Sequence, residues 1–189
     1  MEQKLARCRE KNAEDKNLTD KGLASLALGG LTDGVTVLEL NSAYATFANG
    51  GEYIKPVSYS MVYDANGEVL IDNTPEKNIA FSEETAFIMT ELLEGVVQGG
   101  TAAGYNVGNG IQTCGKTGST DSNYDRWFAG YTSYYSGVVW YGYDYPKTVV
   151  YGGQNPAAVT WKKVMSKVHN GLAYKSLNKP ETLVECQYC

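Results

Sequence analysis

Histidine, basic runs and long apolar stretches are scarce in this chain of 189 residues, and each scarcity disfavours a class of function. With one histidine the chain offers few ligands for a metal centre, so we predict neither a metal site nor a cofactor. The net charge of -5 and the lack of any basic run disfavour nucleic-acid binding. No apolar stretch is long enough to cross a bilayer, so any membrane anchor of the parent protein is expected outside this chain.

Cysteine is also scarce, with four residues in all. Cys186 and Cys189 form a C-x-x-C at the end of the chain, but no βαβ pattern and no second pair of ligands accompanies them. We therefore predict free thiols in a frayed tail. The single histidine, His169, lies near the end of a predicted helix and is expected at a helix end or on the surface, without a catalytic role.

Apolar residues are plentiful, at 43% of the chain, which suffices for one domain with a sizeable core. Cap residues predict three helices, over residues 36–49, 82–97 and 155–171. The segment Leu23–Leu31 is rich in small apolar residues and contains a glycine pair. We predict that this segment is a buried strand or loop.

Strand patterns fill much of the remaining sequence. An Asn-Gly dipeptide at 66–67 lies between two alternating runs and predicts a β-hairpin over residues 57–71. Three further runs, rich in aromatic and β-branched residues, are joined by short turns and cover residues 111–119, 126–132 and 135–143. These runs predict an antiparallel meander of three strands.

One short stretch matches two motifs. Gly110–Thr117 fits the phosphate-binding pattern G-x-x-x-x-G-K-[ST], while Lys116–Gly118 spells the K-T-G of serine acyl-transfer enzymes. A P-loop needs a buried strand before its first glycine and a helix at its Lys-Thr. Residues 103–109 instead carry two glycines and two asparagines, and residues 118–123 are cap and turn formers. The context favours K-T-G on a sheet strand and leaves an NTPase as the last alternative.

Several other segments occur together with K-T-G in one order along the chain. They are Leu26–Thr36 with Glu39, Ala43–Gly51, Ile54–Pro56, Glu84–Ala86, Gly100–Ala102, Gly115–Ser119, Trp127–Tyr131 and Trp140–Tyr143. In this order they resemble the C-terminal part of the transpeptidase domain of bifunctional, class A type penicillin-binding proteins. The resemblance covers residues 22–172, between a charged segment, 1–21, and a polar tail, 173–189. It implies an α/β (α+β) fold: an antiparallel sheet with flanking helices, forming part of the serine transpeptidase and β-lactamase-like fold without its N-terminal half.

The resemblance also implies an activity and a site. The activity is that of a serine-type D-Ala-D-Ala transpeptidase, which acylates on peptidoglycan stem peptides, cross-links the bacterial cell wall and binds β-lactams. Lys116 would supply a cation for the substrate carboxylate, beside the hydroxyls of Thr117 and Ser119. Gly115 and Gly118 would let the peptide approach the strand, and the Ser119 N–H would form half of an oxyanion hole. The implied catalytic residues are Lys116 and Ser119, and the implied substrate-binding residues are Gly115, Thr117, Gly118, Ser119 and Thr120.

The nucleophile motifs of that family do not precede K-T-G here. S-x-x-K occurs once, at Ser176–Lys179, and S-x-N once, at Ser176–Asn178; both follow K-T-G and overlap, so we interpret them as chance matches. The chain is therefore expected to be a fragment, inactive alone, of a protein at the extracytoplasmic face of the bacterial membrane. A missing N-terminal part or a partner chain would complete it. The alternatives are a non-catalytic stem-peptide-binding or scaffold homologue, and a β-lactam-hydrolysing or β-lactam-sensing relative.

Overall fold

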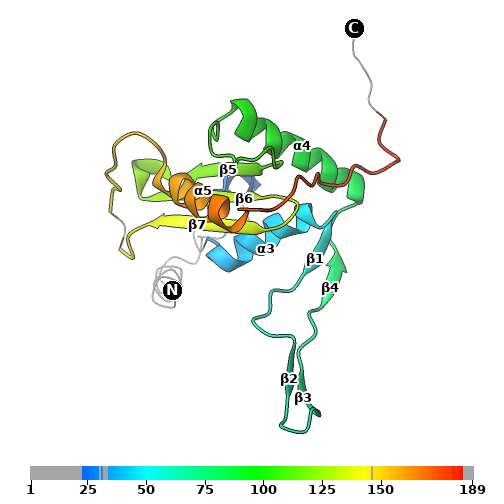
Figure 1. The fold of residues 1–189 in the computed structure, drawn as a ribbon. Helices are drawn as coiled ribbons and strands as arrows, with labels where there is room; N and C mark the ends of the chain where they lie inside the picture. The colour runs from blue at the N-terminus through cyan, green and yellow to red at the C-terminus, as the bar shows by residue number, and fades with distance from the viewer. Residues whose placement is uncertain (1–22, 30, 32–33, 146, 185–189) are drawn as a thin grey trace.

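The centre of the molecule is an antiparallel three-stranded sheet (Figure 1). The structure is a computed structural model that describes residues 23–29, 31, 34–145 and 147–184, so the segment 1–21 and the pair Cys186 and Cys189 lie outside it. The strands run in the order β5-β6-β7, as Cys114–Ser119, Asp125–Tyr131 and Ser136–Gly142. This order and direction confirm the predicted meander.

The first strand begins three residues later than predicted, at Cys114 instead of Ile111. Two hydrogen bonds explain the difference. The Ile111 N–H donates to the Gly108 carbonyl at 3.1 Å, and the Val107 N–H donates to the Thr113 hydroxyl at 3.2 Å. The first contact uses a backbone N–H that a longer strand would need, and the second holds Thr113 against the preceding loop, so residues 111–113 form the end of a loop instead.

The three predicted helices are present and begin at the predicted caps. They are α3 (Val37–Ala48), α4 (Glu83–Gly99) and α5 (Pro156–Val168). The Thr36 hydroxyl accepts from the Glu39 N–H at 3.2 Å while the Glu39 carboxylate accepts from the Thr36 N–H at 2.7 Å, which completes a capping box. The hydrogen bond from the Thr36 N–H holds the pKa of Glu39 below its usual value. Within the described residues, no helix combines the length and apolarity that crossing a bilayer requires.

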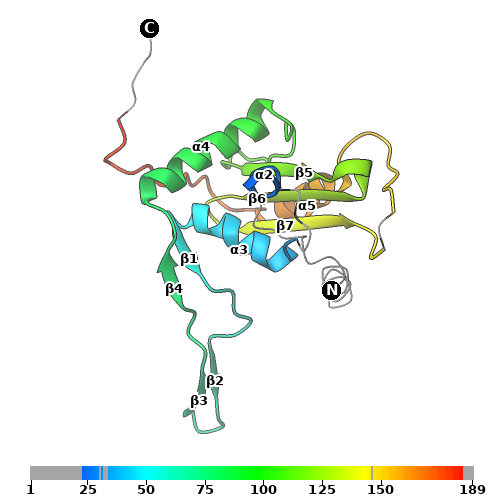
Figure 2. The ribbon, with the colours of Figure 1, turned by 180° about the vertical axis from the view of Figure 1, so that it is seen from behind.

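The prediction for Leu23–Leu31 is wrong. Residues Leu23–Leu28 form helix α2, and the side chains of Leu23 and Leu28 are 84% and 87% exposed. The Leu-Ala-Ser-Leu-Ala-Leu sequence consists largely of strong helix formers, and Gly29, at φ +73°, provides the left-handed residue that ends a helix. Figure 2 shows α2 on the side of the sheet opposite to α5.

An arm extends from the body between α3 and α4 (Figure 1). Its base is the antiparallel pair β1 (Glu52–Ile54) and β4 (Lys77–Ile79), and its end is the hairpin of β2 (Met61–Tyr63) and β3 (Val69–Asp72). The predicted Asn-Gly dipeptide lies at the hairpin turn, where Gly67 has φ +87°. Asp64 accepts backbone N–H groups from Asn66 and Glu68 and so closes the turn.

Helices cover both faces of the central sheet. On one face Phe128 packs against Trp161 of α5, with ring centroids 4.9 Å apart. On the other, Tyr131 and Cys114 pack against Leu93 of α4, and Tyr131 also meets Tyr44 of α3. Strand alternation places Phe128 and Tyr131 on opposite faces, so each strand contributes to both halves of the core.

A row of three glycines crosses the α5 side of the sheet. Gly130 of β6 is paired with Gly115 of β5 and Gly137 of β7. A Cβ on Gly130 would lie 2.8 Å from the Cys114 carbonyl oxygen and 2.9 Å from Trp161 Cζ2. The Trp161 side chain packs over these glycines, and its Nε1 donates to the Gly137 carbonyl at 2.9 Å. The glycines therefore let α5 approach the sheet closely through one large aromatic side chain.

Candidate functional site

Strand β5 carries the predicted site and lies at an edge of the sheet, since β6 is its partner on one side and no described strand pairs with the other. The register places Lys116 opposite Ala129 and Ser119 opposite Arg126. By strand alternation, Lys116 and Gly118 lie on the face of Cys114, while Thr117 and Ser119 lie on the face of Phe128. The predicted groups thus flank one open strand edge from both faces.

Lys116 is exposed, and its ammonium group has little to bind within the protein. Nζ donates to the carbonyl of the next residue, Thr117, at 3.0 Å. It forms no ion pair with any residue that the structure describes. An ammonium ion held only by its own strand remains available to an anion approaching this edge.

The hydroxyl groups of the site differ in their surroundings. Thr117 Oγ1 donates at 3.0 Å to Oγ1 of Thr101, which lies in the turn after α4. Ser119 and Thr120 are exposed, and Thr120 Oγ1 contacts the Asp125 carboxylate at 3.2 Å and accepts from the Asp125 N–H at 2.9 Å. The hydrogen bonds of Thr120 therefore connect the end of β5 to the start of β6. The Thr117 and Thr120 hydroxyls already have partners within the protein, which leaves the Ser119 hydroxyl as the better candidate for binding a ligand.

The two glycines of the motif have packing roles that the sequence did not suggest. A Cβ on Gly115 would lie 2.8 Å from Cζ of Phe128 and 3.0 Å from the Ala129 carbonyl oxygen. A Cβ on Gly118 would lie 3.1 Å from Cβ of Trp127. Gly115 is buried and its missing side chain makes room for the core, while Gly118 is half-buried beside Trp127.

The turn between β5 and β6 is fixed by side chains on both faces. Trp140 Nε1 donates to Asp125 at 2.7 Å, while the buried Arg126 guanidinium donates to the Asn123 side chain and lies over the Tyr151 ring at 5.1 Å. Asn123 has φ +58°, a left-handed conformation that asparagine tolerates better than most residues. Sequence reasoning missed Thr101 and Trp140 as supports of the site.

The structure contradicts the nucleotide-binding alternative. Residues Cys114–Ser119 form one continuous strand through Lys116 and Thr117. A P-loop would begin a helix at these two residues, and the helix N-terminus would bind the phosphates. Here their backbone groups belong to a sheet, so a phosphate cradle of that kind is absent from this segment.

Two other reactive residues near the sheet are excluded as catalytic groups. Burial raises the pKa of the Cys114 thiol to about 12, and the Glu94 carboxylate adds to the effect, so the thiol stays protonated. His169 is at the end of α5 as predicted, but it is fully buried and not on the surface. Its ring nitrogens bind the Thr132 hydroxyl at 2.8 Å and the Met165 carbonyl at 2.7 Å.

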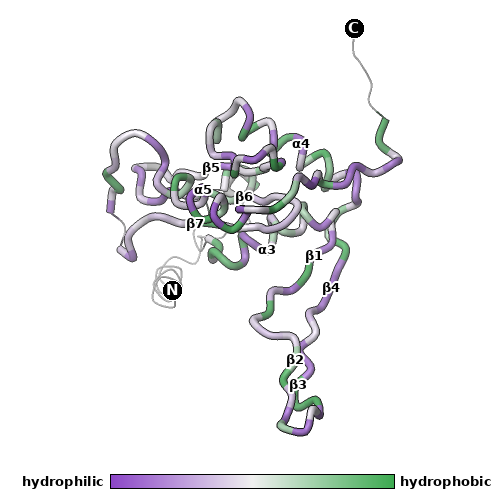
Figure 3. The backbone as a smooth tube through the Cα atoms, in the orientation of Figure 1, coloured by the Kyte–Doolittle hydropathy of each residue, from purple (hydrophilic) through white to green (hydrophobic). Residues whose placement is uncertain are grey.

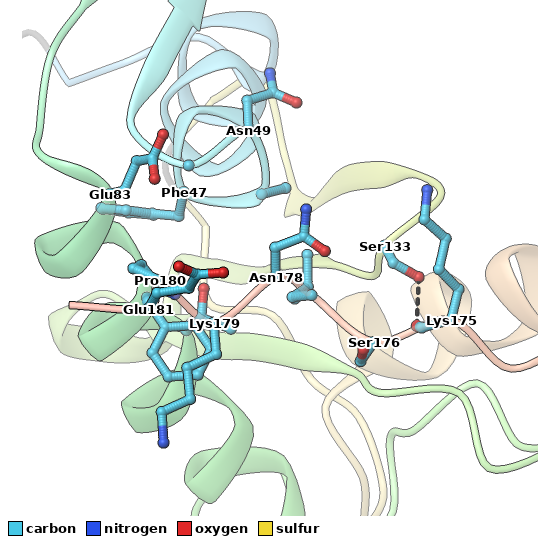
Figure 4. Close-up of a pocket in the computed structure, with 15 residues that line it drawn as sticks. Phe47, Asn49, Glu83, Ser133, Lys175, Ser176, Asn178, Lys179, Pro180 and Glu181 are labelled. Atoms are coloured by element: carbon cyan, nitrogen blue, oxygen red, sulfur yellow. Dashed lines mark hydrogen bonds between the residues drawn. The ribbon is translucent and has the colours of Figure 1, made fainter. Parts of the chain in front are cut away.

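One pocket of the described residues lies away from β5. It has a volume of about 590 Å³ and lies between the end of α3, the start of α4 and the segment Lys175–Glu181 (Figure 4). Ser176 and Lys179 line it, but residues 172–180 have no regular secondary structure. The S-x-x-K match therefore lacks the helical turn that would bring its lysine to its serine.

Comparisons with known proteins identify the family of this chain. A family model described as "Penicillin binding protein transpeptidase domain" matches residues 6–166. This chain belongs to the penicillin-binding protein transpeptidase family. Penicillin-binding protein 1A of Clostridium tetani is 37% identical over 178 residues, which cover 88% of this chain and 22% of that protein. Penicillin-binding protein 1F of Bacillus subtilis is 42% identical over 126 residues, covering 64% and 17%.

Solved structures show the same fold. This chain superposes on penicillin-binding protein 1A from Haemophilus influenzae with a TM-score of 0.68 at 22% identity, over 79% of this chain and 28% of that one. The penicillin-binding protein PonA1 from Mycobacterium tuberculosis gives a TM-score of 0.64 at 29% identity, over 80% and 45%. These matches confirm the predicted partial α/β fold and the class A resemblance. The chain spans about a fifth of the length of its curated relatives.

Proposed function

We propose that this chain forms the part of a peptidoglycan D,D-transpeptidase that binds the terminal carboxylate of a D-Ala-D-Ala stem peptide at the outer edge of β5. β-Lactams, which carry a similarly placed carboxylate, bind at the same edge. The observation that carries the proposal is the exposed Lys116 ammonium group, which forms no ion pair within the described residues. The family assignment supplies the reaction class, and the strand geometry supplies the way a peptide would lie.

In this proposal the side chains and the backbone of β5 have separate roles in binding the peptide. Lys116 neutralises the carboxylate, and the Ser119 hydroxyl donates a hydrogen bond to it. The open backbone edge of residues 115–119 pairs with the extended peptide. The Ser119 N–H forms one half of the oxyanion hole, and loss of such a donor costs about 3–4 kcal/mol of transition-state stabilisation in other enzymes.

The remaining chemistry is assigned to residues other than those of β5. By resemblance to the family, the S-x-x-K serine and its base precede K-T-G, and they would come from a preceding segment of the parent protein or from a partner chain. The serine would attack the penultimate D-Ala carbonyl, release the terminal D-Ala and pass the acyl group to an amine of a neighbouring strand. The site would face the outside of the cytoplasmic membrane, where peptidoglycan lies.

Carboxylate recognition can be tested on this chain without the nucleophile. Binding of a stem peptide that ends in D-Ala-D-Ala would be measured by NMR titration, together with its C-terminal amide as a charge-free analogue. A charge-assisted hydrogen bond contributes about 1.5–3 kcal/mol, so Lys116→Ala is expected to weaken binding of the acid roughly 10- to 150-fold. Lys163→Ala, which removes an exposed lysine from α5, is the matched control and should change nothing.

Equal affinity of the acid and the amide, or unchanged binding by Lys116→Ala, would contradict the proposal. A second measurement addresses the nucleophile. Fluorescent penicillin should leave no covalent band on this chain alone, and a band that disappears with Ser176→Ala would place the nucleophile in the C-terminal segment instead. A non-catalytic homologue would bind the stem peptide but stay unlabelled even after a preceding segment is supplied.

A further inference from the structure

The β2–β3 hairpin at the end of the arm has no core of its own. Each strand pairs only with the other among the described residues, and the hairpin projects away from the body (Figure 1). A two-stranded hairpin in water is marginally stable unless another surface covers one of its faces. The hairpin is therefore a paired structure whose two faces are not covered by any other described element.

The two strands of the hairpin expose several large apolar side chains. Leu70 is 64% exposed and Tyr63 is 56% exposed, and Met61, Val69 and Ile71 are also exposed. Figure 3 shows hydrophobic residues along both strands. Tyrosine and methionine are enriched at the centres of protein interfaces, and contiguous exposed apolar residues mark binding surfaces. This composition is that of an interface.

A β-bulge gives Leu70 a particular position. Tyr63 pairs with Val69 while Val62 pairs with Ile71, so Leu70 is the extra residue of β3. A bulge breaks the regular edge and re-aims a side chain, which disfavours addition of a further strand along β3. The geometry instead presents Leu70 as a projecting side chain that would fill a pocket on a partner.

The charge of the arm indicates the chemistry of that partner. Between Pro56 and Glu76 the sequence has four carboxylates and no lysine, arginine or histidine. Among the residues that the structure describes, Glu76 is the one of these four that forms an ion pair, with Lys55 at 3.7 Å. Hydrogen bonds from the Glu68 and Asn66 N–H groups lower the pKa of Asp64, and those from the Thr74 hydroxyl and N–H lower that of Asp72, so both stay ionised.

We propose that the hairpin Tyr59–Asn73 docks into an apolar groove of a partner protein whose rim carries lysine or arginine, with Leu70 in the groove and Asp64 and Glu68 facing the rim. A second copy of this chain is disfavoured, because two acidic hairpins would repel each other. An anionic lipid surface is disfavoured for the same reason. The inference does not depend on the K-T-G strand.

The test uses the full chain and a random peptide library displayed on phage. Selection on the chain is expected to enrich peptides in which lysine or arginine flanks apolar residues. An enriched peptide, synthesised with a fluorophore, should bind the chain more weakly as salt concentration rises. We expect Leu70→Lys to weaken binding at least 10-fold and Glu68→Lys at least 5-fold. The matched controls are Ile79→Lys, at a residue 77% exposed on β4, and Glu181→Lys on the C-terminal segment, and both should stay within 2-fold.

Enrichment of peptides without basic residues, or equal binding by the Leu70→Lys variant, would overturn the proposal. So would a dimer in sedimentation equilibrium that Leu70→Lys dissociates, because the occupant would then be a second copy. Binding to anionic vesicles that Leu70→Lys abolishes would assign the hairpin to a lipid surface and also refute a protein partner.

Discussion

Gly130 offers the sharpest test of how α5 is held against the sheet. A Cβ at this position would lie 2.8 Å from the Cys114 carbonyl oxygen, 2.9 Å from Phe128 Cε1 and 2.9 Å from Trp161 Cζ2. One of these atoms belongs to the backbone of the neighbouring strand, and the others belong to buried rings that cannot turn aside. Gly130→Ala is therefore expected to force the sheet and the helix apart.

The size of the effect follows from these contacts. Overpacking a well-packed core by one methyl group costs typically 1–3 kcal/mol, and three contacts below 3.0 Å place Gly130→Ala near the upper end, at about 2–3 kcal/mol. For a chain of this length, that loss lowers Tm by roughly 4–12 °C. Urea unfolding followed by tryptophan fluorescence, together with calorimetry, would measure both quantities.

The same substitution elsewhere should have the opposite sign. Gly95 is an exposed residue within α4, and a Cβ there would meet nothing within 4 Å. Gly95→Ala is expected to stabilise the protein by about 0.5–1 kcal/mol, because alanine has the higher helix propensity. A Gly130→Ala variant as stable as the wild type would refute the close approach of Trp161. Combining it with Trp161→Phe should recover part of the loss, since the phenylalanine ring lacks Cζ2.

Further predictions concern the buried polar groups and one cap. Tyr131→Phe removes a 2.8 Å hydrogen bond to Thr90 but leaves Thr90 bonded to the Ala86 carbonyl, so urea unfolding should show a loss of only about 1 kcal/mol. Because burial raises the pKa of Cys114, the protonated thiol contributes its full stabilisation below about pH 9, and this contribution is lost as the pH rises toward 12. The free energy of unfolding should therefore fall across that pH range, and it should fall less in the Cys114→Ala variant. Asn155→Ala removes the N-cap of α5 and should cost about 1 kcal/mol by thermal melting.

The sequence predicted elements whose determinants are local. The capping box at Thr36, the Asn-Gly turn of the hairpin and the Asn-Pro start of α5 each depend on residues within one turn, and all three are present. Helix α2 was missed for an equally physical reason. Burial was inferred from its leucines, whereas helix propensity decided the local structure and Leu23 and Leu28 stayed exposed.

The support of the candidate site depends on contacts that local patterns do not encode. Thr101 reaches Thr117 from the turn after a different element, 16 positions away. Trp140 reaches Asp125 across the β6–β7 pair, 15 positions away. The row formed by Gly115, Gly130 and Gly137 becomes visible only once the strand register is known. The side chains that face each other across a sheet depend on the strand register, and a single sequence predicts the strands but not their register.

Lys116 has a second physical explanation, because natural proteins place lysine on edge strands to prevent pairing with other chains. That explanation accounts for an exposed cation on β5, but it gives no role to the exposed Ser119 hydroxyl or to the turn that Asp125 and Trp140 fix beside it. A protective lysine also needs no particular neighbour, whereas carboxylate binding needs a cation and a hydroxyl on one strand. The stem-peptide titration separates the two explanations, since a merely protective lysine would not distinguish a peptide acid from its amide.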